Sequence, residues 1–173
     1  MKVILQLLLF FGGLMCFLSG CTDQKTKHSL HAAFNELEDL EELVKEAPLD
    51  SINSVRDRLL EMKKDLVWLG SDSNVVFVRS DALIIEELSK GNRYLKDSPS
   101  RFAGIFQEIE RCKTQVSGLV DVIETGADLD ALGDSIDEVY IKKNVEIELN
   151  AVVKLEGVVM ETLRLARLGL ETD

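Results

Sequence analysis

From Leu30 to the end of this 173-residue chain, apolar side chains recur at steps of three and four residues. Spacing of this kind places them on one face of an α-helix, whereas a half-buried strand would require strict alternation. Proline, which interrupts helices, occurs only at Pro48 and Pro99. The pattern therefore predicts an all-α fold in which amphipathic helices bury one face each.

Two helices are expected before residue 71. The first follows the apolar stripe from Leu30 and stops at Pro48, because the residue before a proline disfavours the helical conformation. The second takes Asp50 as its N-cap and ends at Gly70. The two stripes consist of Leu30, Phe34, Leu37, Leu40, Val44 and Ala47, and of Ile52, Val55, Leu59, Met62, Leu66 and Leu69.

Two more helices are expected after a connector at residues 71–74. The spacing favours a helix over about residues 75–95, through Leu83, Ile84 and Leu88, although residues 75–78 alone would suit a strand. The pair Ser98-Pro99 then supplies an N-cap and a first-turn proline for a fourth helix. The fourth stripe is Phe102, Ile105, Phe106, Ile109, Cys112, Val116, Leu119, Val120 and Ile123, and Gly126 closes the helix.

The last helix should be the longest. It runs from about Asp134 to Leu170 after a loop at residues 127–133, with Asp130 or Asp134 as its cap. At about 1.5 Å per residue it would span about 55 Å, and only a kink at Gly157 would shorten it. We therefore expect an elongated antiparallel bundle of four to five helices, with this helix as its spine.

The formal net charge is −11. Removal of residues 1–20 would take away Lys2 and no acid, so that 19 basic and 31 acidic side chains would leave −12. A chain with this charge is a poor partner for nucleic acid, and an acidic domain also gains nothing from anionic lipid headgroups. Membrane association should therefore come from an anchor rather than from a basic surface patch.

The amino terminus has the layout of an export signal, with a basic start, an apolar run and small residues at its end. Its last four residues, Leu18-Ser19-Gly20-Cys21, resemble the bacterial lipobox. That resemblance implies a diacylglycerol on the Cys21 thiol, cleavage before Cys21 and acylation of the new amino terminus. The rival Cys16 follows the bulky pair Leu14-Met15 and suits a cleavage point less well.

These observations predict a signal peptide at residues 1–20, a polar tether at 21–29 and a helical domain at 30–173. Resemblance to lipoproteins of Gram-negative bacteria also implies the outer membrane, facing the periplasm, because Thr22 rather than an Asp follows Cys21. The alternative is an uncleaved transmembrane anchor over 3–19, which is close to the minimum spanning length. Either interpretation places the domain outside the cytoplasm.

No candidate catalytic, cofactor-binding or metal site emerges from the sequence. His28 and His31 have metal-ligand spacing, but no other His or mature thiol is near, so solvated residues at a helix start are expected. Cys112 is in step with Ile109 and Val116, which predicts a buried thiol rather than a reactive one.

Other cofactor motifs are incomplete or absent. Residues 128–134 partly match an EF-hand calcium loop. The match fails because Leu132 stands at a ligand position and Val139 stands where the bidentate Glu should be. Carboxylates such as Glu146 and Glu148 lack the histidines of a di-iron site, because none follows His31. Covalent-haem, phosphate-loop and Gly-x-Ser-x-Gly motifs are also missing.

The sequence therefore predicts a non-enzymatic interaction or structural module, held at the membrane by lipid on Cys21 and contacting an envelope protein. The apolar content of residues 145–170 suggests the partner surface, unless the chain itself buries that segment. The alternative is an envelope lipoprotein that binds a small hydrophobic ligand. The peptidoglycan-linked lipoproteins end in a lysine that bonds to the wall, whereas this chain ends in Asp173. Covalent attachment to the wall by that route is therefore not expected.

Overall fold

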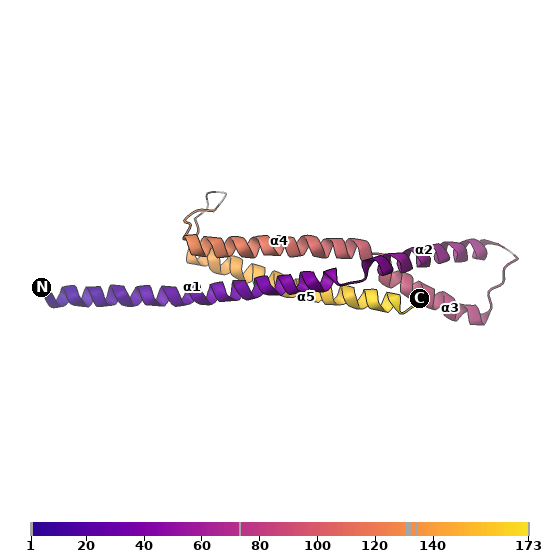
Figure 1. Cartoon of the computed structure of the whole chain (residues 1–173), viewed down its shortest axis with the longest axis horizontal. Coiled ribbons are helices and arrows are strands. Elements are labelled where there is room, and N and C mark those ends of the chain that lie inside the picture. The colour runs from indigo at the N-terminus through magenta and orange to yellow at the C-terminus, as the bar shows by residue number, and fades with distance from the viewer. Residues whose placement is uncertain (1, 73, 131–132, 134, 173) are drawn as a thin grey trace. The chain divides into compact units, whose positions relative to one another are not determined.

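The computed structural model is an all-α helical bundle with a long C-terminal helix, as predicted (Figure 1). It describes residues 2–72, 74–130, 133 and 135–172, with side chains from residue 24 onward. Across these residues the helices are α1 (Lys2–Lys45), α2 (Leu49–Ser71), α3 (Arg79–Leu95), α4 (Ser98–Thr125) and α5 (Glu138–Leu170).

Helix α1 begins much earlier than the sequence pattern indicated. Its backbone is helical from Lys2, so it includes residues 22–29, which we expected to form a polar tether. The core still begins where predicted, because Leu30 is fully buried while Gln24 and Lys25 are exposed. The division into residues 1–20, 21–29 and 30–173 stays a prediction.

Two of the predicted N-caps are wrong. Pro48 occupies the position before α2, and Asp50 lies in the first turn of that helix, where its charge favours the helix dipole without capping it. Ser98 is already helical, and its buried hydroxyl has no hydrogen-bond partner in the described structure. A proline fixes its own φ favourably in a first turn, but it does not decide which preceding residue is the cap.

The start of α3 also differs from the prediction. Residues 75–78 are not helical, and Val78 has extended backbone angles (φ −98°, ψ 167°). Three β-branched valines at positions 75, 76 and 78 disfavour the helix, and the Asp81 carboxylate accepts the Val78 N–H at 2.9 Å. The helix therefore begins at Arg79 rather than at Val75.

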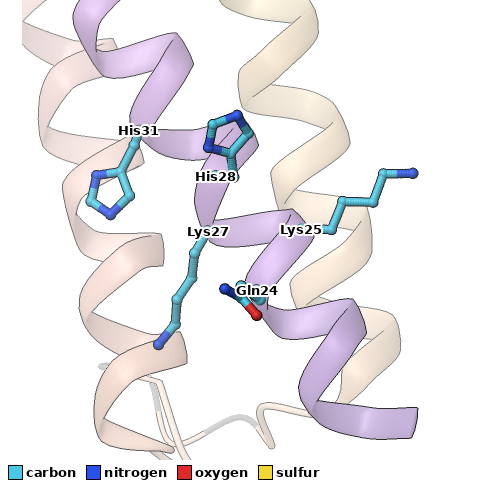
Figure 2. Close-up of a pocket in the computed structure, with 5 residues that line it drawn as sticks. All are labelled: Gln24, Lys25, Lys27, His28 and His31. Carbon is cyan, nitrogen blue, oxygen red and sulfur yellow. The ribbon is translucent and has the colours of Figure 1, made fainter.

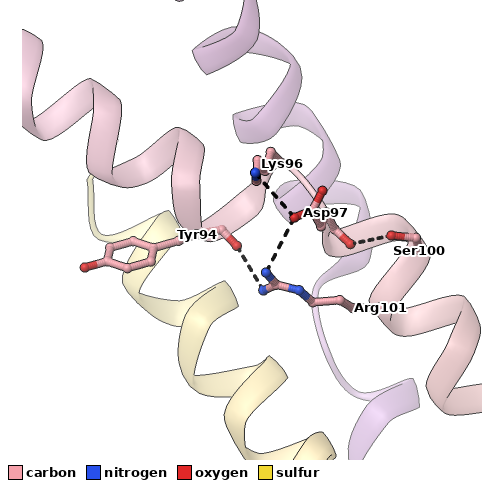
Figure 3. A network of polar contacts seen from close by, with 5 residues as sticks. All are labelled: Tyr94, Lys96, Asp97, Ser100 and Arg101. Carbon is pink, nitrogen blue, oxygen red and sulfur yellow. Dashed lines mark hydrogen bonds and ion pairs between the residues drawn. The ribbon is translucent and has the colours of Figure 1, made fainter.

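The junction between α3 and α4 is held by short-range polar contacts (Figure 3). The Arg101 guanidinium donates to the Tyr94 carbonyl at 3.5 Å and pairs with the Asp97 carboxylate at 3.7 Å. The Asp97 carbonyl accepts the Ser100 hydroxyl at 2.9 Å and the Arg101 N–H at 3.0 Å. The Asp97 carbonyl, rather than the Ser98 side chain, thus accepts hydrogen bonds from the first turn of α4.

Helix α5 begins at Glu138, four residues later than expected. The Asp137 carboxylate accepts the Tyr140 N–H at 2.7 Å, which is the geometry of an N-cap. Asp130 therefore does not cap this helix, and the other candidate, Asp134, lies outside the described residues. Gly126 closes α4 as predicted, with φ at +62° and its N–H bonded to the Val122 carbonyl.

The chain divides into two compact units. Unit 1 consists of Met1–Glu38 and Glu110–Val153, and unit 2 of Asp39–Ile109 and Lys154–Asp173. The apolar core of unit 1 consists of Leu30, Ala33, Leu37, Cys112, Val116, Leu119, Val145 and Val152. The apolar core of unit 2 consists of Leu40, Val44, Ile52, Val55, Leu59, Leu95, Phe102, Ile105, Ile109, Leu155, Val159 and Ala166.

Candidate functional site

The predicted lipid attachment residue, Cys21, lies within α1. Its side chain is outside those that the structure describes, so its lipidation stays a prediction. Among the residues that are described, no helix is both long and apolar enough to cross a membrane.

An open hollow of about 540 Å³ lies beside α1, where the described side chains of that helix begin. Its lining side chains are Gln24, Lys25, Lys27, His28 and His31. Figure 2 shows Lys27 and His31 on the side of α1 that faces the α4 ribbon, whereas Lys25 extends toward the α5 ribbon. The site is therefore a basic region of one helix, and it has no enclosed apolar wall.

The two histidines have the solvent exposure that the sequence predicted, since both side chains are exposed. Within the part of the chain whose side chains are described, no group of three or more His, Cys, Asp or Glu could hold a metal ion. The neighbours of His28 and His31 in the hollow are lysines and a glutamine, which suit an anion better than a cation.

Cys112 is fully buried in unit 1, and its burial confirms the prediction of a core thiol. The guanidinium of Arg111 donates to its sulfur at 3.1 Å and pairs with the Glu148 carboxylate at 3.3 Å. The Glu148 side chain is 11% exposed, against 43% for Arg111. This arrangement pairs the buried Glu148 carboxylate with a cation.

Replacing Arg111 with alanine should lower the free energy of unfolding by about 1–2 kcal/mol, because it leaves the buried Glu148 carboxylate without this partner. Urea unfolding followed by circular dichroism measures the effect. Arg164→Ala is the matched control, since its partner Glu161 is half exposed and its loss should cost less than about 0.5 kcal/mol. Equal effects of the two variants would contradict the structural role of the buried pair.

The described residues of the candidate calcium loop are joined by contacts of their own. The Asp128 carbonyl accepts the Ile136 N–H at 2.9 Å, and one Asp130 oxygen accepts the Tyr140 hydroxyl at 3.4 Å. Gly133 has φ at +85°, a conformation that glycine adopts without strain. These contacts close a turn between α4 and α5, while Asp134 is outside the described residues.

Charged pairs on the surface of unit 2 shift the pKa of their members without forming a site. Hydrogen bonding from Arg164 lowers the pKa of the Glu161 carboxyl, through two bonds of 2.7 and 2.8 Å. Hydrogen bonds that the Lys90 ammonium donates to the Glu87 and Glu86 carboxylates raise the pKa of Lys90. These groups lie on solvated helix faces, where they form surface ion pairs.

The end of the α2–α3 hairpin in unit 2 exposes large apolar side chains. Trp68 and Val67 are each 68% exposed, and Val76 is 80% exposed. We call this surface the hairpin end, and it consists of Met62, Val67, Trp68, Val76, Phe77, Val78, Leu83 and Ile84. Single exposed apolar residues are ordinary, whereas here eight of them fall within positions 62–84.

Sequence reasoning did not single out the hairpin end. The available signal was the continuous apolar run Leu66-Val67-Trp68-Leu69 at the end of a helix, where an amphipathic stripe should have been interrupted. Trp68 is also the only tryptophan of the chain. Comparison of the chain with protein-family models, with curated proteins and with solved structures finds no match.

Proposed function

We propose that this chain is a lipid-anchored protein of the cell envelope that acts without enzymatic chemistry, as an interaction module. In this proposal lipid on Cys21 holds it at the outer membrane, facing the periplasm, and the hairpin end contacts another envelope protein. The exposed apolar side chains around Trp68 are the observation that carries the contact.

Among the described residues, α2 and α3 contact each other along the hairpin. Nearer the base of the hairpin, Leu59 and Leu95 are buried, and Gly91 and Gly169 approach other side chains of unit 2 closely. Beyond Leu59 no residue of α2 is buried, and in α3 burial begins at Gly91. A hairpin of two helices cannot enclose all of its own apolar surface, so a partner would complete it.

The charge of this region favours a protein over an anionic membrane. Residues 61–90 contain four basic and six acidic side chains, and a net negative surface is repelled by anionic headgroups. Aromatic side chains and methionine are enriched in protein interfaces, and tryptophan is among the residues that contribute most of the binding energy.

The surface proposed here differs from the one that the sequence suggested. Within residues 145–170, Val145, Val152 and Val159 are buried, so α5 uses its main stripe for the core. The alternative of a hydrophobic-ligand carrier gains no support from the α1 hollow, because this hollow is wide open and does not enclose a ligand.

Photo-crosslinking from the hairpin end tests the proposal in the intact envelope. A benzoyl-phenylalanine placed at Trp68 should form one discrete adduct with a protein, and the same probe at the exposed Gln107 of α4 should not. Val76→Asp, which charges a side chain that is 80% exposed, should reduce the Trp68 adduct about tenfold. Adducts to lipid alone, or equal adducts at both positions, would contradict the interaction module.

A further inference from the structure

The stretch from Gln24 to Asn35 reverses the charge of the chain locally. It contains Lys25, Lys27 and two histidines but no acid, although the chain as a whole has a net charge of −11. Asp23 precedes this stretch and Glu36 follows it. We call Lys25, Lys27, His28 and His31 the α1 basic cluster.

The basic cluster is accessible to a partner. Lys25, His28 and His31 are exposed, and Lys27 is half-buried with its stem along the helix. All four line the open hollow of about 540 Å³, and they extend to more than one side of α1 (Figure 2). Cationic groups around an open hollow suit several phosphate groups of a surface, rather than one enclosed small ligand.

The cluster also lies close to the predicted anchor. Helix α1 is continuous through Cys21, and at about 1.5 Å per residue Lys25 lies about 6 Å, and His31 about 15 Å, along the axis from it. Electrostatic interactions in salt of physiological strength fade over about 8 Å. The charge nearest the bilayer, rather than the acidic total of the chain, therefore decides how the protein meets a charged membrane surface.

We propose that the α1 basic cluster binds the anionic headgroups of the phospholipid surface into which the Cys21 lipid inserts. This inference rests on the proposed lipid anchor and adds a second, electrostatic contact to it. A lysine held at an anionic surface strengthens binding about fivefold, so two lysines contribute about twenty-five-fold. The contact would fix the direction in which α1 leaves the membrane, which a lipid alone does not do.

Hydrogen exchange of the full-length, cell-expressed protein in vesicles tests this contact. The backbone amides of residues 24–31 should exchange at least about threefold more slowly in vesicles containing about one-third phosphatidylglycerol than in pure phosphatidylcholine. Adding about 0.5 M salt should remove the difference. Lys25→Gln with Lys27→Gln should also remove it, because the two fixed charges are lost.

The matched control is Lys142→Gln with Lys143→Gln, which removes two exposed adjacent lysines from α5 and should retain the difference. Intact mass of the same sample separates the two proposals. Lipid on Cys21 together with equal exchange in both vesicles would overturn the headgroup contact and leave the anchor standing. A chain without lipid on Cys21 would overturn the anchor and this inference with it.

Discussion

Replacing Gly169 with alanine should lower the free energy of unfolding by about 2 kcal/mol. A Cβ at this position would overlap the γ and δ carbons of Leu95, which is fully buried. Overpacking of a filled core costs about 1–3 kcal/mol. Thermal unfolding of the detergent-solubilised protein should show a Tm lowered by about 4–8 °C.

Gly157→Ala provides the control on the same helix. Nothing lies within 4 Å of a Cβ at that position, and alanine is favoured over glycine in an exposed helix by about 1 kcal/mol. Although the two substitutions are chemically identical, they should change the free energy of unfolding in opposite directions because their surroundings differ. A Gly169 variant as stable as the Gly157 variant would show that α5 does not approach Leu95 as the structure has it.

The sequence pattern identified the buried stripes where a helix has several neighbours. Every third or fourth residue from Phe102 to Leu119 in the predicted stripe of α4 is buried, apart from the half-buried Phe106. In α1, Leu30, Leu37, Leu40 and Val44 are buried as well. The 3.6-residue period of the helix fixes which side chains share a face, so these positions need no knowledge of the partner.

The pattern does not say whether a face has a neighbour. Leu83 and Ile84 belong to the predicted stripe of α3, yet they are 69% and 63% exposed. Met62 of α2 is also exposed, although it continues the stripe of Ile52, Val55 and Leu59. Burial there depends on whether a third helix covers the hairpin, and helical periodicity carries no information about that.

Contacts between distant parts of the sequence were equally beyond prediction. Arg111 and Glu148 are 37 positions apart, and their pairing depends on how α4 and α5 align within unit 1. The burial of Cys112 could be predicted, because it depends on the stripe of α4 alone. The sequence around Gly169 also gave no sign of its close contact, because that contact depends on where Leu95 packs in the folded chain.

Replacing Cys21 with serine should abolish lipid attachment completely. The thioether that the lipobox resemblance implies requires a sulfur nucleophile, and a serine hydroxyl is not ionised at neutral pH as a thiol partly is. Wild-type protein extracted in detergent should give the mass of a chain that begins at Cys21 and carries two or three acyl groups. The Cys21→Ser protein should keep residues 1–20 and incorporate no labelled palmitate.

Cys16→Ser is the matched control, because it removes a thiol from the same apolar segment, five positions earlier. It should leave the lipid label and the processed mass unchanged, since the bulky Leu14-Met15 pair precedes Cys16 where the lipobox needs small residues. Label that survives in Cys21→Ser would contradict the attachment site. A wild-type chain that retains residues 1–20 without lipid would instead support an uncleaved transmembrane anchor. Two or more acyl chains on Cys21 would make such an anchor unnecessary, because they hold a protein durably at a membrane.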